Sequence, residues 1–320
     1  MTPVSIVIVT WNSGEVLESC VSSLFAHVPE KDFELFLVDN DSEDNTYLEA
    51  YENRPNIRVI RNGGNLGFAK AVNIGFRRAS GEYFLALNPD MIFRSNPFPR
   101  LIEELRKDPQ IGVIAPLLHG VDDKPQIQDF YPTFPSALQL LFHRSILENI
   151  PPVQALARRF LHARIGASGV HFVDQIPGAF LFFHRNLFGN DPVLNETFFI
   201  WFEDVDFCWR VHGKGMKVAV VADEKITHIG GTSFNMWDVP RKRLMFTQSN
   251  LTYLRLNHNV GSYLLHSVLM ILNALSTFFL YPLYLKKKGW PAVRARLIVE
   301  IKVIGLVVRN AAERLTGNSK

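Results

Sequence analysis

The stretch Leu85-Ala86-Leu87-Asn88-Pro89-Asp90-Met91-Ile92 decides the fold of this chain. The apolar run from Tyr83 to Leu87 predicts a buried strand, and Asn88-Pro89 is a turn signal that ends its pairing. Asp90 follows at once, and in an open α/β sheet ligands bind beyond the carboxyl ends of the strands. A carboxylate at such a place suits a divalent cation, and a cation suits a diphosphate. A turn aspartate that caps the next segment is the alternative interpretation.

Composition and charge limit the classes of protein to which the chain can belong. It has 320 residues, 47% hydrophobic and 20% charged, which is enough for a globular domain of ordinary core size plus an appendage. The net charge of +3 is too small to indicate a nucleic-acid partner, and the basic residues crowd the C-terminal third. Cys20 and Cys208 are far apart in the sequence, so no disulfide framework is implied. No apolar leader precedes the first predicted strand, and we expect no secretory signal.

The first 90 residues alternate between apolar runs and segments of helical periodicity. This alternation predicts an α/β fold with a mostly parallel, Rossmann-like sheet and helices on both of its faces. The predicted strands are residues 4–9, 33–38, 57–60 and 83–87, and the predicted helices are residues 15–27 and 69–79. Polar residues follow three of these strands, at positions 10–12, 39–41 and 88–90. Ligand-competent side chains at several strand ends indicate a binding site there.

The loop Asn62-Gly63-Gly64-Asn65-Leu66-Gly67 is rich in glycine and precedes a predicted helix. Such a loop can present backbone N–H groups to a phosphate. It is neither the dinucleotide-binding fingerprint nor a P-loop, because its glycines are spaced differently and no Gly-Lys-Ser/Thr follows. A tight turn that needs positive φ angles explains the glycines equally well.

A second informative stretch, residues 198–210, holds three acids within four positions, directly after four aromatic residues at 198, 199, 201 and 202. Glu203 and Asp204 stand where a helix begins, and Asp206 is spaced to pair with Arg210. A charged helix start is one interpretation. The surrounding Phe and Trp residues favour another, because a carboxylate in apolar, sugar-stacking surroundings is what a general base requires.

His228 ends an apolar strand and precedes Gly-Gly. An isolated histidine is most often structural. Its place at a strand end also fits a metal or phosphate contact.

Together these stretches resemble the inverting glycosyltransferases of family 2, which have the GT-A fold, and above all their rhamnosyltransferase-like members. The resemblance extends over roughly residues 3–235. It rests on the strand ends, the glycine-rich loop, Leu87-Asn88-Pro89-Asp90, Pro177-Gly178-Ala179, the segment from Glu203 to Arg210, and His228.

The resemblance implies a role for each matching position. The donor-binding residues would be Thr10, Trp11, Asn12, Asp39, Asn65, Gly67, Lys70, Asn73, Asn88 and Asp90. Asp204 would be the catalytic base, with Trp201 and Glu203 at the acceptor. Asp90 and His228 would hold Mg²⁺ or Mn²⁺. One departure is clear, because the first acid of the family's Asp-x-Asp motif is Asn88 here, which suggests weaker metal binding.

The implied activity is transfer of a sugar, with L-rhamnose from dTDP-rhamnose as the best guess. The acceptor would be a hydroxyl of a saccharide or a polyprenol-linked saccharide, in the synthesis of cell-surface polysaccharide. Two alternatives stay open. One is a catalytically weak nucleotide-sugar-binding protein, which the change at Asn88 motivates. The other is a sugar nucleotidyltransferase, although the loop from Thr10 to Gly14 lacks the basic residues that a triphosphate requires.

The C-terminal third combines apolar segments with basic flanks. Residues 259–285 contain no Asp, Glu, Lys or Arg, and Lys286-Lys287-Lys288 follows them. A second apolar segment, residues 293–308, carries Arg and Lys. We therefore expect a glycosyltransferase domain over residues 1–240 and a membrane-associating helical region over 241–320. A peripheral or monotopic protein on the cytoplasmic face of the bacterial inner membrane is expected, bound to its anionic surface. A true span over 261–285 and a helix packed on the catalytic domain are the alternatives.

Overall fold

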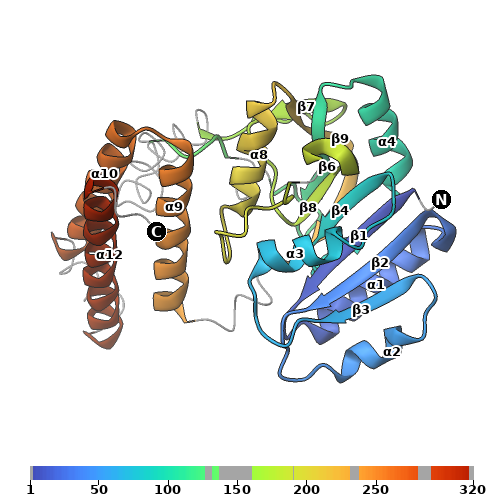
Figure 1. Ribbon diagram of the computed structural model, residues 1–320, viewed down its shortest axis with the longest axis horizontal. Helices are drawn as coiled ribbons and strands as arrows, with labels where there is room; N and C mark the ends of the chain where they lie inside the picture. Colours follow the sequence, from blue (N-terminus) through green and yellow to red (C-terminus); the bar gives the residue numbers. More distant parts are fainter. Residues whose placement is uncertain are drawn as a thin grey trace. The chain divides into compact units, whose positions relative to one another are not determined.

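The computed structural model describes residues 3–126, 132–136, 161–189, 191–230, 238–279 and 290–316. The chain divides into two compact units (Figure 1). Unit 1 comprises residues 1–133 and 163–236, and unit 2 comprises residues 134–162 and 237–320. All the predicted site residues belong to unit 1. The predicted domain boundary at residue 240 stays a prediction.

The first half of unit 1 is the predicted strand–helix alternation. Its elements are β1 (Val4–Thr10), α1 (Gly14–His27), β2 (Phe33–Asp39), α2 (Glu49–Glu52), β3 (Ile57–Arg61), α3 (Phe68–Phe76) and β4 (Tyr83–Leu87). The strands pair in parallel in the order β3-β2-β1-β4. Every residue of β1 and β4 is buried, as expected for central strands covered on both faces. Short 3₁₀ helices at Glu30–Asp32 and Thr46–Leu48 complete this half.

The second half extends the sheet with antiparallel neighbours. It contains β5 (Met91–Phe93), α4 (Phe98–Lys107), β6 (Ile111–His119), β7 (Val170–Val173), β8 (Phe180–His184), a 3₁₀ helix (Arg185–Phe188), α8 (Glu203–Gly213) and β9 (Lys217–His228). The strand order continues from β4 through β8, β6 and β9 to β5, and β7 pairs with β9. Among the described strands of this half, β6 and β9 pair in parallel and the other pairs are antiparallel.

The α/β fold is thus confirmed, but the expected mostly parallel sheet is wrong, because the sheet is mixed. The expectation rested on the first 90 residues, where helices supply the crossovers that parallel neighbours need. Beyond β4 that alternation ends, and β8 runs antiparallel to both β4 and β6.

Aromatic packing fixes the helix that carries the predicted base. The ring of Phe183 on β8 lies 5.4 Å from that of Phe84 on β4 and 5.2 Å from that of Phe207 on α8. Phe84, Phe183 and Phe207 are fully buried, so this stack anchors α8 to the centre of the sheet.

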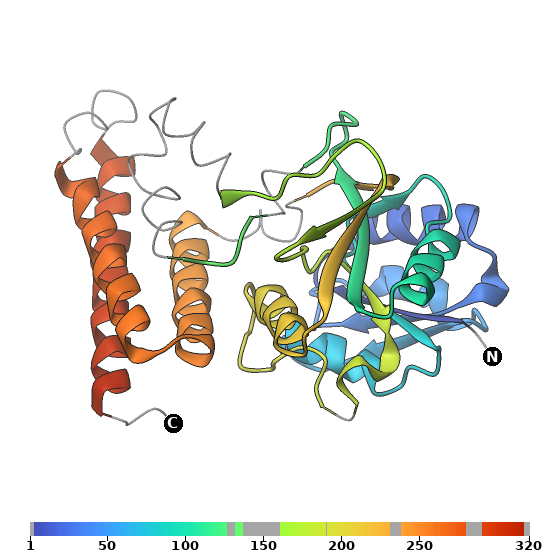
Figure 2. The same cartoon turned by 90° about the horizontal axis from the view of Figure 1, so that it is seen from above.

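The described part of unit 2 contains three long helices, α9 (Val239–Asn257), α10 (Val260–Phe279) and α12 (Trp290–Thr316), which pack side by side (Figure 2). The two apolar segments were predicted as individual helices, whereas α9 was expected only as part of the helical region over 241–320. Within the ranges that the structure describes, no helix has the length and hydropathy needed to cross a membrane. The last residues of the predicted 261–285 span lie outside those ranges.

Candidate active site

The ends of β1 and β2 form one hydrogen-bonded cluster. Thr10 and Asp39 are neighbours in the parallel register, and both are buried. The hydroxyl of Ser42 donates to Asp39 Oδ1 at 2.6 Å, and its backbone N–H reaches Asp39 Oδ2 at 3.3 Å. The Tyr47 hydroxyl lies 2.9 Å from Thr10 Oγ1 and 3.1 Å from Ser42 Oγ. The structure therefore brings together Thr10 and Asp39, two residues predicted to bind the nucleotide sugar. Tyr47 belongs to the same cluster, and no sequence motif pointed to it.

Asn12 joins the loops that follow these two strands. Its backbone N–H donates to Ser42 Oγ at 2.9 Å, and its Oδ1 accepts from the N–H of Glu43 at 2.8 Å. Asn12 adopts a positive φ of 51° to make both contacts. Its Nδ2 is buried without a hydrogen-bond partner among the described residues, which leaves a donor for a ligand. Trp11 is partly exposed beside it.

The glycine-rich loop meets the segment that leads to α8. Gly67 has φ +83°, and a Cβ there would lie 2.5 Å from the carbonyl oxygen of Phe199. The N–H of Phe68 donates to that same oxygen at 2.8 Å. Only glycine fits this position, because both the backbone conformation and the close approach exclude a side chain. Asn65 caps the loop through Oδ1 and the N–H of Gly67 at 3.1 Å, and Lys70 is exposed one helical turn on.

Asn73 is buried in a structural contact. Its Nδ2 donates to the carbonyl of Leu194 at 2.7 Å, and its Oδ1 accepts from the N–H of Leu194 at 3.0 Å. Its Nδ2 also lies 3.0 Å from Glu196 Oε1. The amide therefore fastens α3 to residues 194–196. Its predicted contact with the donor stays a prediction.

Asp90 and His228 lie together at the end of β4. His228 pairs with Met91 across β9 and β5, and the N–H of Ile229 donates to the backbone carbonyl of Asp90 at 3.0 Å. His228 Nε2 is 3.5 Å from Asp90 Oδ2, and both side chains are buried. Asp90 Oδ1 is buried with no hydrogen-bond partner among the described residues.

Asp90 Oδ1 and Oδ2 and His228 Nε2 are atoms of the kind that bind a divalent cation. Carboxylate oxygen and neutral imidazole are both ligands for Mn²⁺ and Mg²⁺ sites, and a buried carboxylate oxygen without a donor needs a positive partner. Across the ranges that the structure describes, no group of three or more His, Cys, Asp and Glu side chains is placed to hold a metal. Donor phosphates and water would have to supply the remaining ligands.

One turn connects Asp204 to the Asn88–Asp90 segment. Leu87 on β4 faces Phe180 on β8, and the N–H of Asn88 donates to the carbonyl of Ala179 at 3.0 Å. The N–H of Gly178, one residue earlier, donates to Asp204 Oδ2 at 2.8 Å. Residues 177–179 therefore touch both acidic segments at one edge of the sheet.

The start of α8 is strained and buried. Trp201 and Phe202 both adopt positive φ, at 62° and 69°, which costs free energy for residues other than glycine. Glu203 follows, buried, with Oε2 lacking a hydrogen-bond partner among the described residues. Burial, and then the charge of Asp204, raise the pKa of Glu203 well above its usual range.

Asp204 is partly exposed, and its two oxygens have different donors. Gly178 N–H serves Oδ2, and the N–H of Val205 donates to Oδ1 at 2.8 Å. Burial raises the pKa of Asp204 above the ordinary 3.8, and these N–H groups limit the rise. A carboxylate made more basic and still open to solvent has the properties of a general base.

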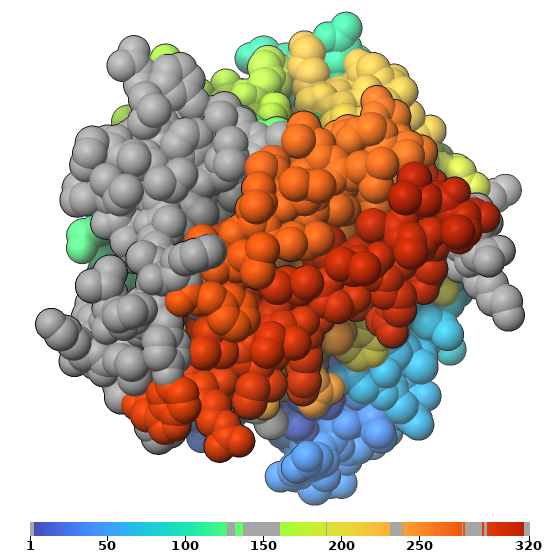
Figure 3. Space-filling model, turned by 90° about the vertical axis from the view of Figure 1, so that its left-hand side faces the viewer, coloured from blue at the N-terminus to red at the C-terminus, as the bar shows by residue number. Residues whose placement is uncertain are grey.

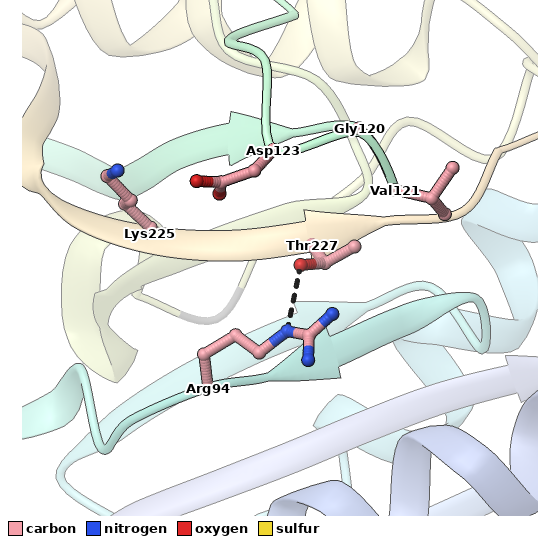
Figure 4. Close-up of a pocket in the computed structure, with 6 residues that line it drawn as sticks. All are labelled: Arg94, Gly120, Val121, Asp123, Lys225 and Thr227. Atoms are coloured by element: carbon pink, nitrogen blue, oxygen red, sulfur yellow. Dashed lines mark hydrogen bonds between the residues drawn. The ribbon is translucent and has the colours of Figure 1, made fainter.

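A cavity of about 280 Å³ lies elsewhere, lined by Arg94, Gly120, Val121, Asp123, Lys225 and Thr227 (Figure 4). Arg94 Nε donates to Thr227 Oγ1 at 3.2 Å. Successive side chains of a strand point to opposite faces, so Thr227 and Lys225 lie on the other face of β9 from His228. This cavity is therefore distinct from the Asp90–His228 pair.

Comparison with known proteins identifies the kind of enzyme. The profile of Glycosyl transferase family 2 matches residues 5–166. N-acetylglucosaminyl-diphospho-decaprenol L-rhamnosyltransferase of Mycobacterium tuberculosis is 26% identical over 237 residues, covering 70% of this chain and 75% of that protein. Dolichol-phosphate mannosyltransferase of Pyrococcus furiosus is 31% identical over 119 residues, covering 37% of this chain and 34% of that protein.

Solved structures agree on the fold. GalNAc-T7 with UDP, GalNAc and Mn²⁺ superposes with a TM-score of 0.57 at 20% identity, over 72% of this chain and 44% of that one. The mannosyltransferase PcManGT of Pyrobaculum calidifontis, in complex with GDP-Man and Mn²⁺, gives 0.53 at 14% identity, over 99% and 88%. These likenesses fit the mixed GT-A-like sheet. The chain belongs to glycosyl transferase family 2 and is a glycosyltransferase.

Proposed function

We propose that this glycosyltransferase is inverting and moves a sugar from a nucleoside-diphosphate donor to a hydroxyl of a saccharide or polyprenol-linked saccharide. The observation that carries the proposal is the turn 177–179, which contacts Asp204 on one side and Asn88 on the other. The M. tuberculosis relative is named as a rhamnosyltransferase. It supports L-rhamnose from dTDP-rhamnose, and a role in cell-surface polysaccharide synthesis.

The base is Asp204. It accepts the proton of the acceptor hydroxyl as that oxygen attacks the anomeric carbon from the side opposite the leaving group, so the configuration inverts. The N–H groups of Gly178 and Val205 hold both carboxylate oxygens in place while the proton moves. Burial and the charge of Asp204 raise the pKa of Glu203, which disfavours a second negative charge beside Asp204.

The nucleotide sugar binds at the carboxyl ends of β1, β2 and β4. Thr10, Asp39 and Tyr47 offer hydroxyl and carboxylate groups to the nucleobase and ribose of the sugar donor. The Nδ2 group of Asn12 offers an N–H that has no other hydrogen-bond partner among the described residues. Asp90 and His228 would hold Mg²⁺ or Mn²⁺ against the diphosphate. Such an ion stabilises the charge that develops on the leaving nucleoside diphosphate. PcManGT and GalNAc-T7 were solved with Mn²⁺, which supports this assignment.

The decisive test is Asp204→Asn, assayed by release of nucleoside diphosphate from a panel that starts with dTDP-rhamnose and UDP-hexoses. We expect turnover to fall by about 10²–10⁴, the usual contribution of a general base. Asp206→Asn is the matched control, since Asp206 lies two residues along the same helix and pairs with Arg210 at 3.0 Å. It should lower the unfolding temperature while turnover by the folded protein persists. Near-normal turnover of Asp204→Asn, or a product with retained configuration, would contradict the proposal.

One observation favours a second candidate, a nucleotide-sugar-binding protein with weak activity. Asn88 replaces a carboxylate, and Asp90 and His228 are the two ligands that remain. In that case donor would bind with micromolar or similar affinity, but no donor in the panel would release its nucleotide in the presence of Mn²⁺ and lipid-linked acceptor.

We further propose that unit 2 attaches the enzyme to an anionic membrane, on the cytoplasmic face of the bacterial inner membrane. Residues 237–320 contain thirteen Lys and Arg but three Asp and Glu, although the whole chain carries only +3. Helix α10 has no Asp, Glu, Lys or Arg, and Leu265, Val268, Leu272 and Leu275 along it are exposed, which makes an apolar stripe. Figure 3 shows the face of the molecule on which α10 and α12 lie, in orange and red. Apolar burial and attraction to anionic lipid act together on such a helix.

Vesicle sedimentation tests this attachment. The full chain should pellet with vesicles containing phosphatidylglycerol and less with phosphatidylcholine alone. The double variant Leu265→Glu/Leu272→Glu should stay in the supernatant. Leu256→Glu, at an exposed leucine of α9, is the matched control and should still pellet. Equal pelleting of both variants would contradict the assignment of this stripe.

A further inference from the structure

The turn that follows β6 brings Gln126 against His228. The N–H of Gln126 donates to the carbonyl of Leu118 at 2.9 Å, and the N–H of Gly120 donates to the carbonyl of Lys124 at 2.9 Å, which closes the turn. From this base the Gln126 side chain makes two contacts with His228. Its Oε1 lies 3.2 Å from His228 Nδ1, and its Nε2 lies 3.5 Å from the His228 carbonyl oxygen.

The pair of contacts fixes the orientation of the Gln126 amide. A backbone carbonyl oxygen can only accept, so the group facing it must be the Nε2 donor. The amide oxygen is then the group that faces His228 Nδ1. An oxygen in that position can only accept, and Nδ1 therefore carries the hydrogen. In a neutral imidazole the other nitrogen, Nε2, is left as an acceptor.

This acceptor faces the predicted metal site. Nε2 lies 3.5 Å from Asp90 Oδ2, so two electron-rich atoms approach each other in a buried place. A cation between them turns that approach into attraction. We propose that Gln126 is a positioning residue that selects the Nδ1–H tautomer of His228 and thereby makes Nε2 a ligand for a divalent cation beside Asp90. The inference rests on the proposed function in one respect, which is that a cation binds there.

The change at Asn88 explains why this chain depends on such a partner. An uncharged amide stands where the family's motif has a second carboxylate, so the imidazole supplies a larger share of the binding. Partners that hydrogen-bond to the far nitrogen of a metal-binding histidine typically contribute 10- to 100-fold to metal affinity.

The tautomer can be read without metal. We would label histidine with ¹⁵N in the full chain and record two-bond correlation spectra at alkaline pH. His228→Ala identifies the signals. We expect His228 as the Nδ1–H form in the native protein and a shift toward the Nε2–H form in Gln126→Leu. Gln110→Leu, at an exposed glutamine, is the matched control and should leave the spectrum unchanged. A native His228 in the Nε2–H form would overturn the inference.

Metal affinity provides the second readout, measured as free Mn²⁺ by electron paramagnetic resonance. Gln126→Leu should weaken Mn²⁺ binding about 10- to 100-fold. The double variant Gln126→Leu/His228→Ala should bind no more weakly than His228→Ala, because the glutamine acts through the histidine. Gln126→Glu, which keeps the acceptor for Nδ1–H, should retain affinity and also serves if the leucine variant does not fold.

The outcomes separate this inference from the proposed function. If His228→Ala loses Mn²⁺ but Gln126→Leu does not, the role of Gln126 is wrong and the metal site stands. If the losses of the two single variants add in the double variant, Gln126 acts by another route and the inference fails. If neither single variant changes Mn²⁺ binding, the metal role of His228 in the proposed function is itself wrong.

Discussion

Replacing Gly67 by alanine tests whether the glycine-rich loop positions α8, the helix that carries the proposed base. Gly67 has φ +83° and ψ 168°, a region that is almost restricted to glycine. The added methyl would lie 2.5 Å from the carbonyl oxygen of Phe199 and 2.9 Å from its ring. The Phe199 backbone would have to move, and its 2.8 Å hydrogen bond with the N–H of Phe68 would be lost.

The expected cost follows from these two terms. Holding alanine in this conformation costs roughly 1–3 kcal/mol. Losing the hydrogen bond adds about 0.5–1.5 kcal/mol, so unit 1 should be destabilised by about 2–4 kcal/mol. Turnover should fall further, by about 10²-fold, since a shift of about 1 Å at Phe199 moves the chain that enters α8 and carries Asp204.

Gly63→Ala is the matched control. Gly63 also has positive φ, at +65°, but a Cβ there would have no atom within 4 Å. Only the backbone term applies, so we expect a loss of about 1 kcal/mol and nearly unchanged turnover. Stability would be measured by urea unfolding followed by circular dichroism, and turnover by nucleotide release. Equal losses for the two variants would refute the idea that the Phe199 contact matters.

Three further changes test other contacts of the site. Asn73→Ala removes both hydrogen bonds to Leu194 and should cost about 2–3 kcal/mol in urea unfolding, because it leaves buried backbone groups unsatisfied. The raised pKa of Glu203 means that its contribution to stability is present in acid and is lost as pH rises through that pKa. Glu203→Gln should therefore unfold at a similar temperature to the native protein near pH 5 and at a higher one at pH 9. A native protein as stable as the variant at pH 9 would contradict this. Asn88→Asp adds a second carboxylate beside Asp90 and should tighten Mn²⁺ binding about tenfold, as increasing ligand charge does elsewhere. Unchanged binding would place Asn88 away from the ion.

The local sequence was sufficient to predict the bounds of an element where a hydrophobic pattern meets a residue that stops it. The strand Tyr83–Leu87 has the predicted bounds because an uninterrupted apolar run meets Asn88-Pro89, which cannot continue the pairing. Helix α9 shows the opposite case. Its 19 residues mix polar and apolar side chains without a clear stripe, and its buried face, with Tyr253 among it, is defined by packing against α10 and α12.

The sequence pattern could not predict which partners the side chains contact. The family resemblance placed Asn73 at the donor, whereas the amide in the structure hydrogen-bonds to Leu194, which is 121 positions away in the sequence. Gln126 belongs to no motif that the sequence analysis recognised. Its proposed role follows from the position of β9, which brings His228 beside it. Contacts of this kind depend on which strands become neighbours, and the antiparallel pairing of β4 with β8 was not foreseen.

The strain at Trp201 and Phe202 ties these observations together. Two successive residues with positive φ cost roughly 2–6 kcal/mol in total, a large share of the stability of an ordinary domain. A helix needs no such turn at its start, and a relaxed one would let α8 begin in another direction. The conformation persists because Phe202 is buried and Phe199 is fastened to Phe68. The positive-φ conformation sets the direction of the first turn of α8, where Asp204 accepts a hydrogen bond from the N–H of Gly178. Strain kept at this point, and not relieved by glycine, argues that the position of Asp204 is what the surrounding contacts serve.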